Sequence, residues 1–182
     1  NDYAVLTGYN GKSSSELNIP QMLDGYEVKK IAAGTFDSVS WLESLYINAK
    51  NPEIESGAVR NCSNLKVVEF VNGVKTIASY AFQNCPMLTS VTCEWADSIA
   101  SDAFIDCSAL PYQPLGAAQL EYSMADMGYV ITGFAETYSG NSSGIYIPKY
   151  IKYFYEENDE EYTVMSVYEI GEYAFKDQAQ LR

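Results

Sequence analysis

The residues with the most reactive side chains are four cysteines, three of which recur at a regular spacing as Cys62, Cys85 and Cys107. If these three stand on adjacent coils of a repeat, about 4.8 Å apart, they fall within the roughly 4.4–6.8 Å Cα separation of a disulfide. Three stacked cysteines cannot all pair, and a zinc site needs ligands that converge on one point. Reduced thiols packed as small apolar groups are therefore favoured, with no metal and no cofactor.

A second candidate for chemistry is the acidic run Glu156–Glu161. It lacks the alternating Asp/Asn spacing and the glycine of an ordered calcium loop, so a solvated loop is favoured. The chain contains no histidine, which removes the usual general base near neutral pH and the commonest metal ligand. No pair of carboxylates is marked out for hydrolysis. We therefore predict that the protein is not an enzyme.

Charge and hydropathy narrow the possible partners. The formal net charge of −13 disfavours nucleic acid and anionic membranes, because phosphate binding needs clustered Lys and Arg. No stretch approaches the roughly 18–20 apolar residues of a membrane span, so we expect membrane association only through an anchor outside this chain. The chain starts at Asn1 and stops at Arg182, where a further repeat is due, so we expect a fragment of a longer protein.

These side chains are positioned by an internal repeat. Four segments align, and their first isoleucines are 23, 23 and 22 residues apart: Ile31–Phe36, Ile54–Val59, Ile77–Phe82 and Ile99–Phe104. Three residues after each segment comes a valine or cysteine, and three further on a leucine. Each leucine opens an alternating stretch such as Leu42–Ile47, which predicts a short strand with one buried face. The spacing of three from Phe to Cys predicts one short helical turn per coil.

The order Leu-x-x-Ile-x-Ile, then Val, then Ile-x-x-x-Ala-Phe-x-x-Cys resembles the BspA-like leucine-rich repeat of bacterial surface proteins. The closest coil is Leu65–Pro86, and the resemblance covers roughly residues 17–110 and 145–182. It implies an α/β repeat solenoid, a right-handed leucine-rich-repeat coil of about 23 residues whose short strands alternate with short helical turns. Such coils bury their apolar faces only by stacking. The chain lacks the asparagine ladder of the commoner leucine-rich repeat.

A longer duplication predicts two modules. Leu6–Tyr9 resembles Ile131–Phe134, and Leu17–Pro20 resembles Ile145–Pro148. Each start has the pattern of two strands joined by a Gly/Ser/Asn turn, which predicts a β-hairpin. We assign a hairpin and repeat module to residues 1–110, a linker with a short helix near Leu120–Met127 to residues 111–128, and a second, truncated module to residues 129–182. Whether the second module continues the first stack is left open.

The concave strand face is the predicted binding surface. If Leu45 and Ile47 point inward, their neighbours point outward, and a middle row runs through Asn18, Tyr46, Glu69 and Thr92. The candidate ligand-binding residues are Asn18, Tyr46, Asn48, Val67, Glu69, Val71, Thr92, Glu94 and Trp95. An ordinary exposed strand face is the alternative. Tyrosines crowd residues 146–173, where an interface and plain exposed strands are equally good interpretations.

Two functions are compatible with these features. The first is a secreted or cell-surface interaction module that adheres to a host protein, matrix component or glycan, as the resemblance to surface adhesins implies. The alternative is a structural spacer that presents another domain and has no ligand of its own.

Overall fold

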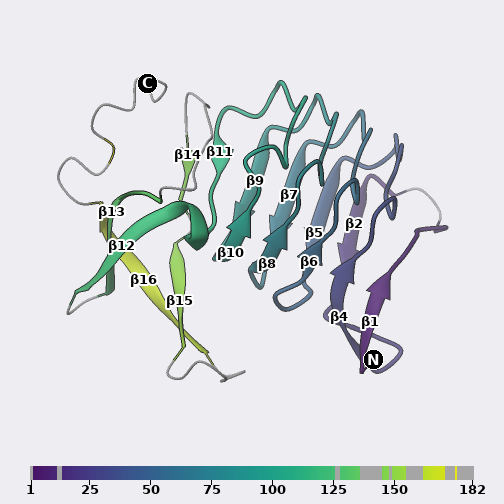
Figure 1. The fold of residues 1–182 in the computed structure, drawn as a ribbon. Coiled ribbons are helices and arrows are strands. Elements are labelled where there is room, and N and C mark those ends of the chain that lie inside the picture. Colours follow the sequence, from purple (N-terminus) through teal and green to yellow (C-terminus); the bar gives the residue numbers. More distant parts are fainter. Residues whose placement is uncertain are drawn as a thin grey trace.

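The computed structural model describes residues 2–11, 14–125, 128–135, 145–147, 149–154, 162–170 and 175. From β1 to β10 the chain winds into a solenoid of stacked coils with two parallel sheets (Figure 1). The first, called here the β4 sheet, consists of β1 (Tyr3–Leu6), β4 (Tyr26–Ile31), β6 (Glu53–Ile54), β8 (Val74–Ile77) and β10 (Ala96–Ile99), with β3 (Met22–Leu23) antiparallel to β4.

The second sheet, called here the β7 sheet, carries the predicted binding surface. It consists of β2 (Glu16–Ile19), β5 (Ser44–Ile47), β7 (Val67–Phe70) and β9 (Ser90–Cys93), all parallel. Leu45 pairs with Val68, which in turn pairs with Val91, and all three side chains are buried. The alternation of inward and outward residues is therefore confirmed, and the repeat register predicted from the spacing is the register of the sheet.

The segments between the sheets are turns, so the predicted helical turns are wrong. The backbone N–H of Phe36 donates to Ala58 at 2.8 Å, and that of Val59 donates to Ala81 at 2.8 Å. These donors reach the next coil and not a carbonyl of their own turn, which an α-helix would require. Among the described residues the one helix is a 3-10 turn, η1 (Ala117–Gln119). The fold is thus a β-solenoid, and the α/β class is corrected.

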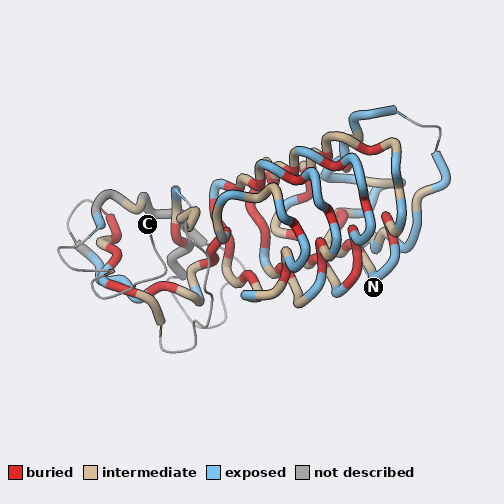
Figure 2. Tube along the Cα trace, turned by 90° about the horizontal axis from the view of Figure 1, so that it is seen from above, coloured by how far each residue is buried: buried red, intermediate tan, exposed pale blue. Residues whose placement is uncertain are grey.

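Buried residues recur in every coil of the solenoid (Figure 2). Phe70, Phe82 and Phe104 stack along the solenoid: the Phe82 ring lies edge-on to Phe70 at 6.4 Å and parallel to Phe104 at 5.0 Å between centroids. Phe82 is fully buried. A single apolar column therefore connects neighbouring coils, as expected when one coil cannot bury its own apolar face.

The chain start is a coil and not the predicted hairpin. β1 pairs with β4, whereas β2 pairs with β5, so the two strands belong to different sheets. Both pairings are parallel. The turn-forming residues between them therefore carry the chain from one sheet to the other.

Residues 112–119 close the other end of the solenoid. The hydroxyl of Tyr112 accepts from the Val91 N–H at 3.0 Å and donates to the Val91 carbonyl at 3.1 Å, where a further strand would pair. Gln119 Oε1 accepts from the Ile99 N–H at 3.1 Å. Gly116 lies so close to Ser98 that a Cβ on it would be 2.8 Å from the Ser98 Cα. Side chains thus satisfy the edges of β9 and β10.

The remaining strands form a sheet in the order β12 (Leu120–Ala125), β13 (Gly128–Phe134), β16 (Tyr162–Ile170) and β15 (Tyr150–Phe154), beside a short parallel pair of β11 (Gln113–Pro114) and β14 (Ile145–Tyr146). The helix predicted near Leu120–Met127 is wrong, because β12 is a strand paired antiparallel with β13. The predicted second hairpin is also wrong, because β13 pairs with β16 and β14 with β11. The acidic run 156–161 lies outside the described residues.

Candidate functional site

The structure aligns the predicted middle row. Asn18 pairs with Tyr46, Tyr46 with Glu69, and Glu69 with Thr92, so one residue from each of four coils lies on a single line. Asn18 is exposed and the other three are half-buried against one another. Val67 and Val71, on the same face, are also half-buried. A ligand laid along the row can contact every coil at once.

Asparagines fix the loops that follow these strands. The side-chain amide of Asn48 donates to the Asn18 side-chain oxygen, and that of Asn72 donates to the Asn48 carbonyl at 2.7 Å. Asn48 is therefore engaged in holding the coils together at the end of the row. Its half-buried side chain leaves less surface for a ligand than the sequence alone indicates.

A hollow of about 250 Å³ lies where the strands end. Four predicted residues line it, namely Glu69, Val71, Thr92 and Glu94. Its other wall comes from Tyr146 and Lys149, some fifty residues later in the chain. The Tyr146 hydroxyl donates to the Cys93 carbonyl at 3.1 Å, and the Tyr150 N–H donates to the Glu94 carbonyl at 2.9 Å.

Tyr146 and Lys149 are the site residues that the sequence reasoning missed. The signal was present, because the similarity of Leu17–Pro20 to Ile145–Pro148 aligns Tyr146 with Asn18 of the predicted row. The hydrogen bond that Lys149 donates to Tyr150, together with the negative charge of Glu94, raises the pKa of Lys149. Lys149 is therefore a cation at neutral pH, placed beside a carboxylate.

Trp95 differs from its prediction. It was expected to extend the exposed patch, but its side chain is only 5% exposed. The indole ring lies over Gly73, where a Cβ would be 2.2 Å from the ring, and Gly73 has a φ of +69°. Trp95 therefore forms the floor of a neighbouring hollow of about 270 Å³, whose rim is formed by Gln21, Lys50, Asn72 and Glu94. Glu94 borders both hollows.

The cysteines stand apart from this surface. All four are free and buried. The thiols of Cys62, Cys85 and Cys107 each donate to a carbonyl of the preceding coil, at 3.0, 3.3 and 3.0 Å. Hydrogen bonding to the Cys107 and Cys62 thiols, together with burial, raises the pKa of Cys85. Burial also raises the pKa of Cys93 to about 12. The favoured interpretation, reduced thiols packed in the core, is confirmed.

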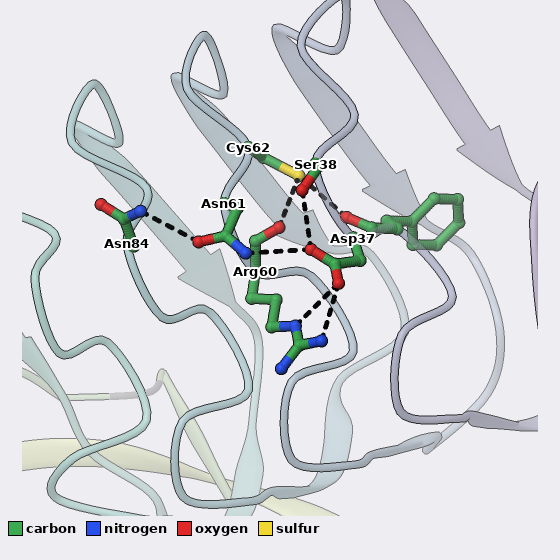
Figure 3. Close-up of polar contacts among 7 residues, drawn as sticks. Asp37, Ser38, Arg60, Asn61, Cys62 and Asn84 are labelled. Atoms are coloured by element: carbon green, nitrogen blue, oxygen red, sulfur yellow. Dashed lines mark hydrogen bonds and ion pairs between the residues drawn. The ribbon is translucent and has the colours of Figure 1, made fainter.

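A polar ladder joins three coils at the turns (Figure 3). Arg60 donates to Asp37 Oδ2 at 2.9 and 2.7 Å, and Asn61 donates to Asp37 Oδ1 at 3.0 Å. Asn84 continues the ladder by donating to Asn61 at 2.9 Å. These bonds, the Arg60 contact first, lower the pKa of Asp37 to about 2. This ladder was not predicted from the sequence.

The described residues contain no group of three or more His, Cys, Asp or Glu that could hold a metal ion. The exposed row and its hollow offer carboxylates, an amine, hydroxyls and amides at a rigid sheet edge. Such an arrangement can form hydrogen bonds and ion pairs with a ligand across several coils.

Residues 9–112, more than half of the chain, match the family model described as the BspA type leucine rich repeat region, in six copies. The chain belongs to the BspA-type leucine-rich-repeat family. Comparison with curated proteins and with solved structures found no significant match in either set. Leucine-rich repeats generally mediate protein binding, and BspA-type proteins are typically associated with bacterial surfaces. In the described part of the chain, no helix has the length and apolar character needed to cross a bilayer.

Proposed function

We propose that this BspA-type protein is a secreted or cell-surface adhesion module whose ligand binds along the exposed face of the β7 sheet and into the hollow at its end. One observation carries the proposal. Asn18, Tyr46, Glu69 and Thr92 lie in register across four coils, and the row ends in a hollow lined by Glu94 and Lys149. The ligand is a host protein, a matrix component or a glycan.

The polarity of this face favours a macromolecular ligand. The hollow combines two carboxylates and an amine with Tyr146, whose ring is apolar and whose hydroxyl is anchored. Tyrosine is favoured at interfaces for that combination of properties. Each residue supplies a modest contact, so affinity depends on engaging several coils together. The acidic character of the chain argues against a nucleic-acid ligand.

The test is biolayer interferometry with the immobilised protein against extracellular-matrix proteins, serum proteins and glycans, at low and physiological salt. We expect saturable binding that survives physiological salt. Tyr46→Ala and Glu69→Lys should each weaken it roughly tenfold or more, a loss of about 1.4 kcal/mol.

Two substitutions away from the row serve as matched controls. Tyr26→Ala removes an exposed tyrosine from the β4 sheet, and Glu121→Lys reverses an exposed charge on β12. Both should leave the affinity unchanged. If the two row variants also bind normally, the strand face is not the site. If the folded protein binds none of the proteins or glycans tested, a structural spacer without its own ligand is favoured instead.

A further inference from the structure

The unit that begins the solenoid occurs twice with the same strand pairing. In the first copy Ala4 pairs with Val28, and Val5 with Lys30, so one residue of β4 is skipped. In the second copy Tyr129 pairs with Val167, and Val130 with Glu169, again with one residue skipped. β13 and β16 therefore repeat β1 and β4, bulge included.

The adjoining hairpins agree with this equivalence. Met22 pairs with Glu27 and Leu23 with Tyr26, while Tyr150 pairs with Ser166 and Ile151 with Met165. The same offset of 139 residues relates β4 to β16 in both sets of pairs. The two starting units are thus structurally equivalent, and the second differs by a longer hairpin.

The second starting unit is covered. β12 adds antiparallel to the edge of β13, with Tyr122 opposite Ile131, Ser123 opposite Val130 and Met124 opposite Tyr129. Leu115 and Leu120 join Tyr129 and Ile131 in one buried cluster. As a result Tyr129 is 6% exposed and Ile131 is 0% exposed.

The first starting unit is open. β1 is the terminal strand of the β4 sheet, and among the described strands it pairs with β4 alone (Figure 1). Tyr3 and Val5 are 39% and 37% exposed, and Leu6, the equivalent of Ile131, is only partly buried. The opposite end of the solenoid is closed by Tyr112 and Gln119. An apolar edge strand without such closure is a template for strand addition.

We propose that the outer edge of β1 is a docking site for a neighbouring repeat module of the same kind, which adds a strand equivalent to β12. The established β12–β13 pairing sets the geometry. The incoming strand is antiparallel, with the counterpart of Ser123 opposite Val5 and that of Met124 opposite Ala4. Modules then join end to end through backbone hydrogen bonds.

The register can be tested by disulfide trapping. The full-length Val5→Cys protein is mixed with a peptide of residues 117–125 in which Ser123→Cys carries a thiopyridyl disulfide. The thiolate introduced at position 5 attacks the peptide sulfur, forms the mixed disulfide and releases pyridine-2-thione, whose absorbance reports the rate. We expect this peptide to react at least tenfold faster than one carrying the group at Met124→Cys, because a one-residue shift places the sulfur on the other face. The unmodified protein controls for its own buried thiols.

A fused strand provides a second measurement that does not depend on peptide affinity. Residues 117–125 are placed directly before Asn1, so that residues 1 and 2 stand in the chain where residues 126 and 127 stand between β12 and β13. Hydrogen exchange should then slow at residues 3–6 by at least tenfold, while a scrambled extension should leave it unchanged. Equal trapping rates for the two peptides, or exchange unaffected by the fused strand, would overturn the proposal. So would protection gained only at residues 128–134, since the added strand would then have displaced β12.

Discussion

Replacing Phe82 by alanine tests whether the column of rings holds the stack of coils together. Phe82 is fully buried, lies parallel to Phe104 at 5.0 Å and edge-on to Phe70 at 6.4 Å. The Phe82 ring therefore packs against Phe104 of the following coil and against Phe70 of its own coil. Removing the ring opens a cavity between coils that surrounding β-strands, fixed by their ladders, cannot close.

The expected loss in unfolding free energy is about 3–5 kcal/mol, the usual range for a buried Phe→Ala change. The two ring contacts place Phe82 toward the upper end, because aromatic pairs add about 0.5–1.5 kcal/mol beyond area burial. For a chain of this length the thermal midpoint should fall by roughly 6–20 °C. Urea denaturation followed by far-UV circular dichroism at 25 °C measures the loss directly.

Two variants calibrate the result. Val59 occupies the position of Phe82 in the preceding coil and is also fully buried. Val59→Ala should lower the free energy of unfolding by about half as much as Phe82→Ala, because it removes less apolar surface. Tyr26→Ala, at an exposed position, should change stability by less than about 0.5 kcal/mol. A loss below about 1 kcal/mol for Phe82→Ala, or a larger loss for Val59→Ala, would refute the role assigned to the ring column.

Two further predictions concern the turns. Tyr80 has a φ of +61° at a position where two other coils have Gly34 and Gly57, so Tyr80→Gly should stabilise the protein by roughly 0.5–1 kcal/mol, measured as a shift in the urea midpoint. A decrease would show that the exposed Tyr80 ring makes a stabilising contact. The pKa of Asp37 is lowered from its ordinary 3.8 to about 2, so its contribution to stability is complete above about pH 4 and is lost as the pH falls toward 2. The difference in urea midpoint between the unchanged protein and Asp37→Asn should therefore shrink between pH 5 and pH 2, and a constant difference would exclude this linkage.

The repeat itself could be predicted from the sequence, because stacked coils must place the same kind of buried residue at the same position in every coil. Ile31, Ile54, Ile77 and Ile99 must recur every 22–23 residues if each coil places one isoleucine on the previous one, and they do pair in register. The free cysteines could also be predicted from the stacking, because three cysteines at one repeated position cannot all pair. A thiol on a stacked position has a carbonyl of the preceding coil within reach and needs no other partner.

The turns could not be predicted in this way, because a spacing of three suits both a helical turn and a tight bend. What separates the two is where the backbone N–H groups donate. In the solenoid the N–H groups of Phe36, Val59 and Phe82 donate to the next coil, and neighbouring N–H groups donate to carbonyls only three residues back. The residue two places after each Phe or Val takes a left-handed φ: Ser38, Asn61, Asn84 and Asp106. Three of these four are Asn or Asp, residues that tolerate this conformation, which is the sequence signal for a bend.

For the candidate site, the strand row could be predicted and its surroundings could not. Alternation along a strand places Tyr46 and Glu69 on one face, and the structure agrees. The position of Trp95 depends on Gly73 in the preceding coil, whose missing side chain leaves room for the indole ring. Tyr146 and Lys149 reach the site through contacts fifty residues distant along the chain, and the similarity of the two starting units was the one sequence signal for them.

The hollow lies where one module meets the start of the next, and this location links the two proposals. Sequence alignment of the two starting units equates Tyr146 with Asn18 and Lys149 with Gln21. Asn18 heads the exposed row, and Gln21 borders the second hollow. If a neighbouring module docks on β1 as proposed, its last coil comes to lie beside Asn18 and Gln21 as Thr92 and Glu94 lie beside Tyr146 and Lys149. Each junction in an array then creates one hollow, whose chemistry is set by the residues at these two positions. Affinity for a repetitive ligand should consequently rise with the number of junctions, because each junction supplies one such hollow.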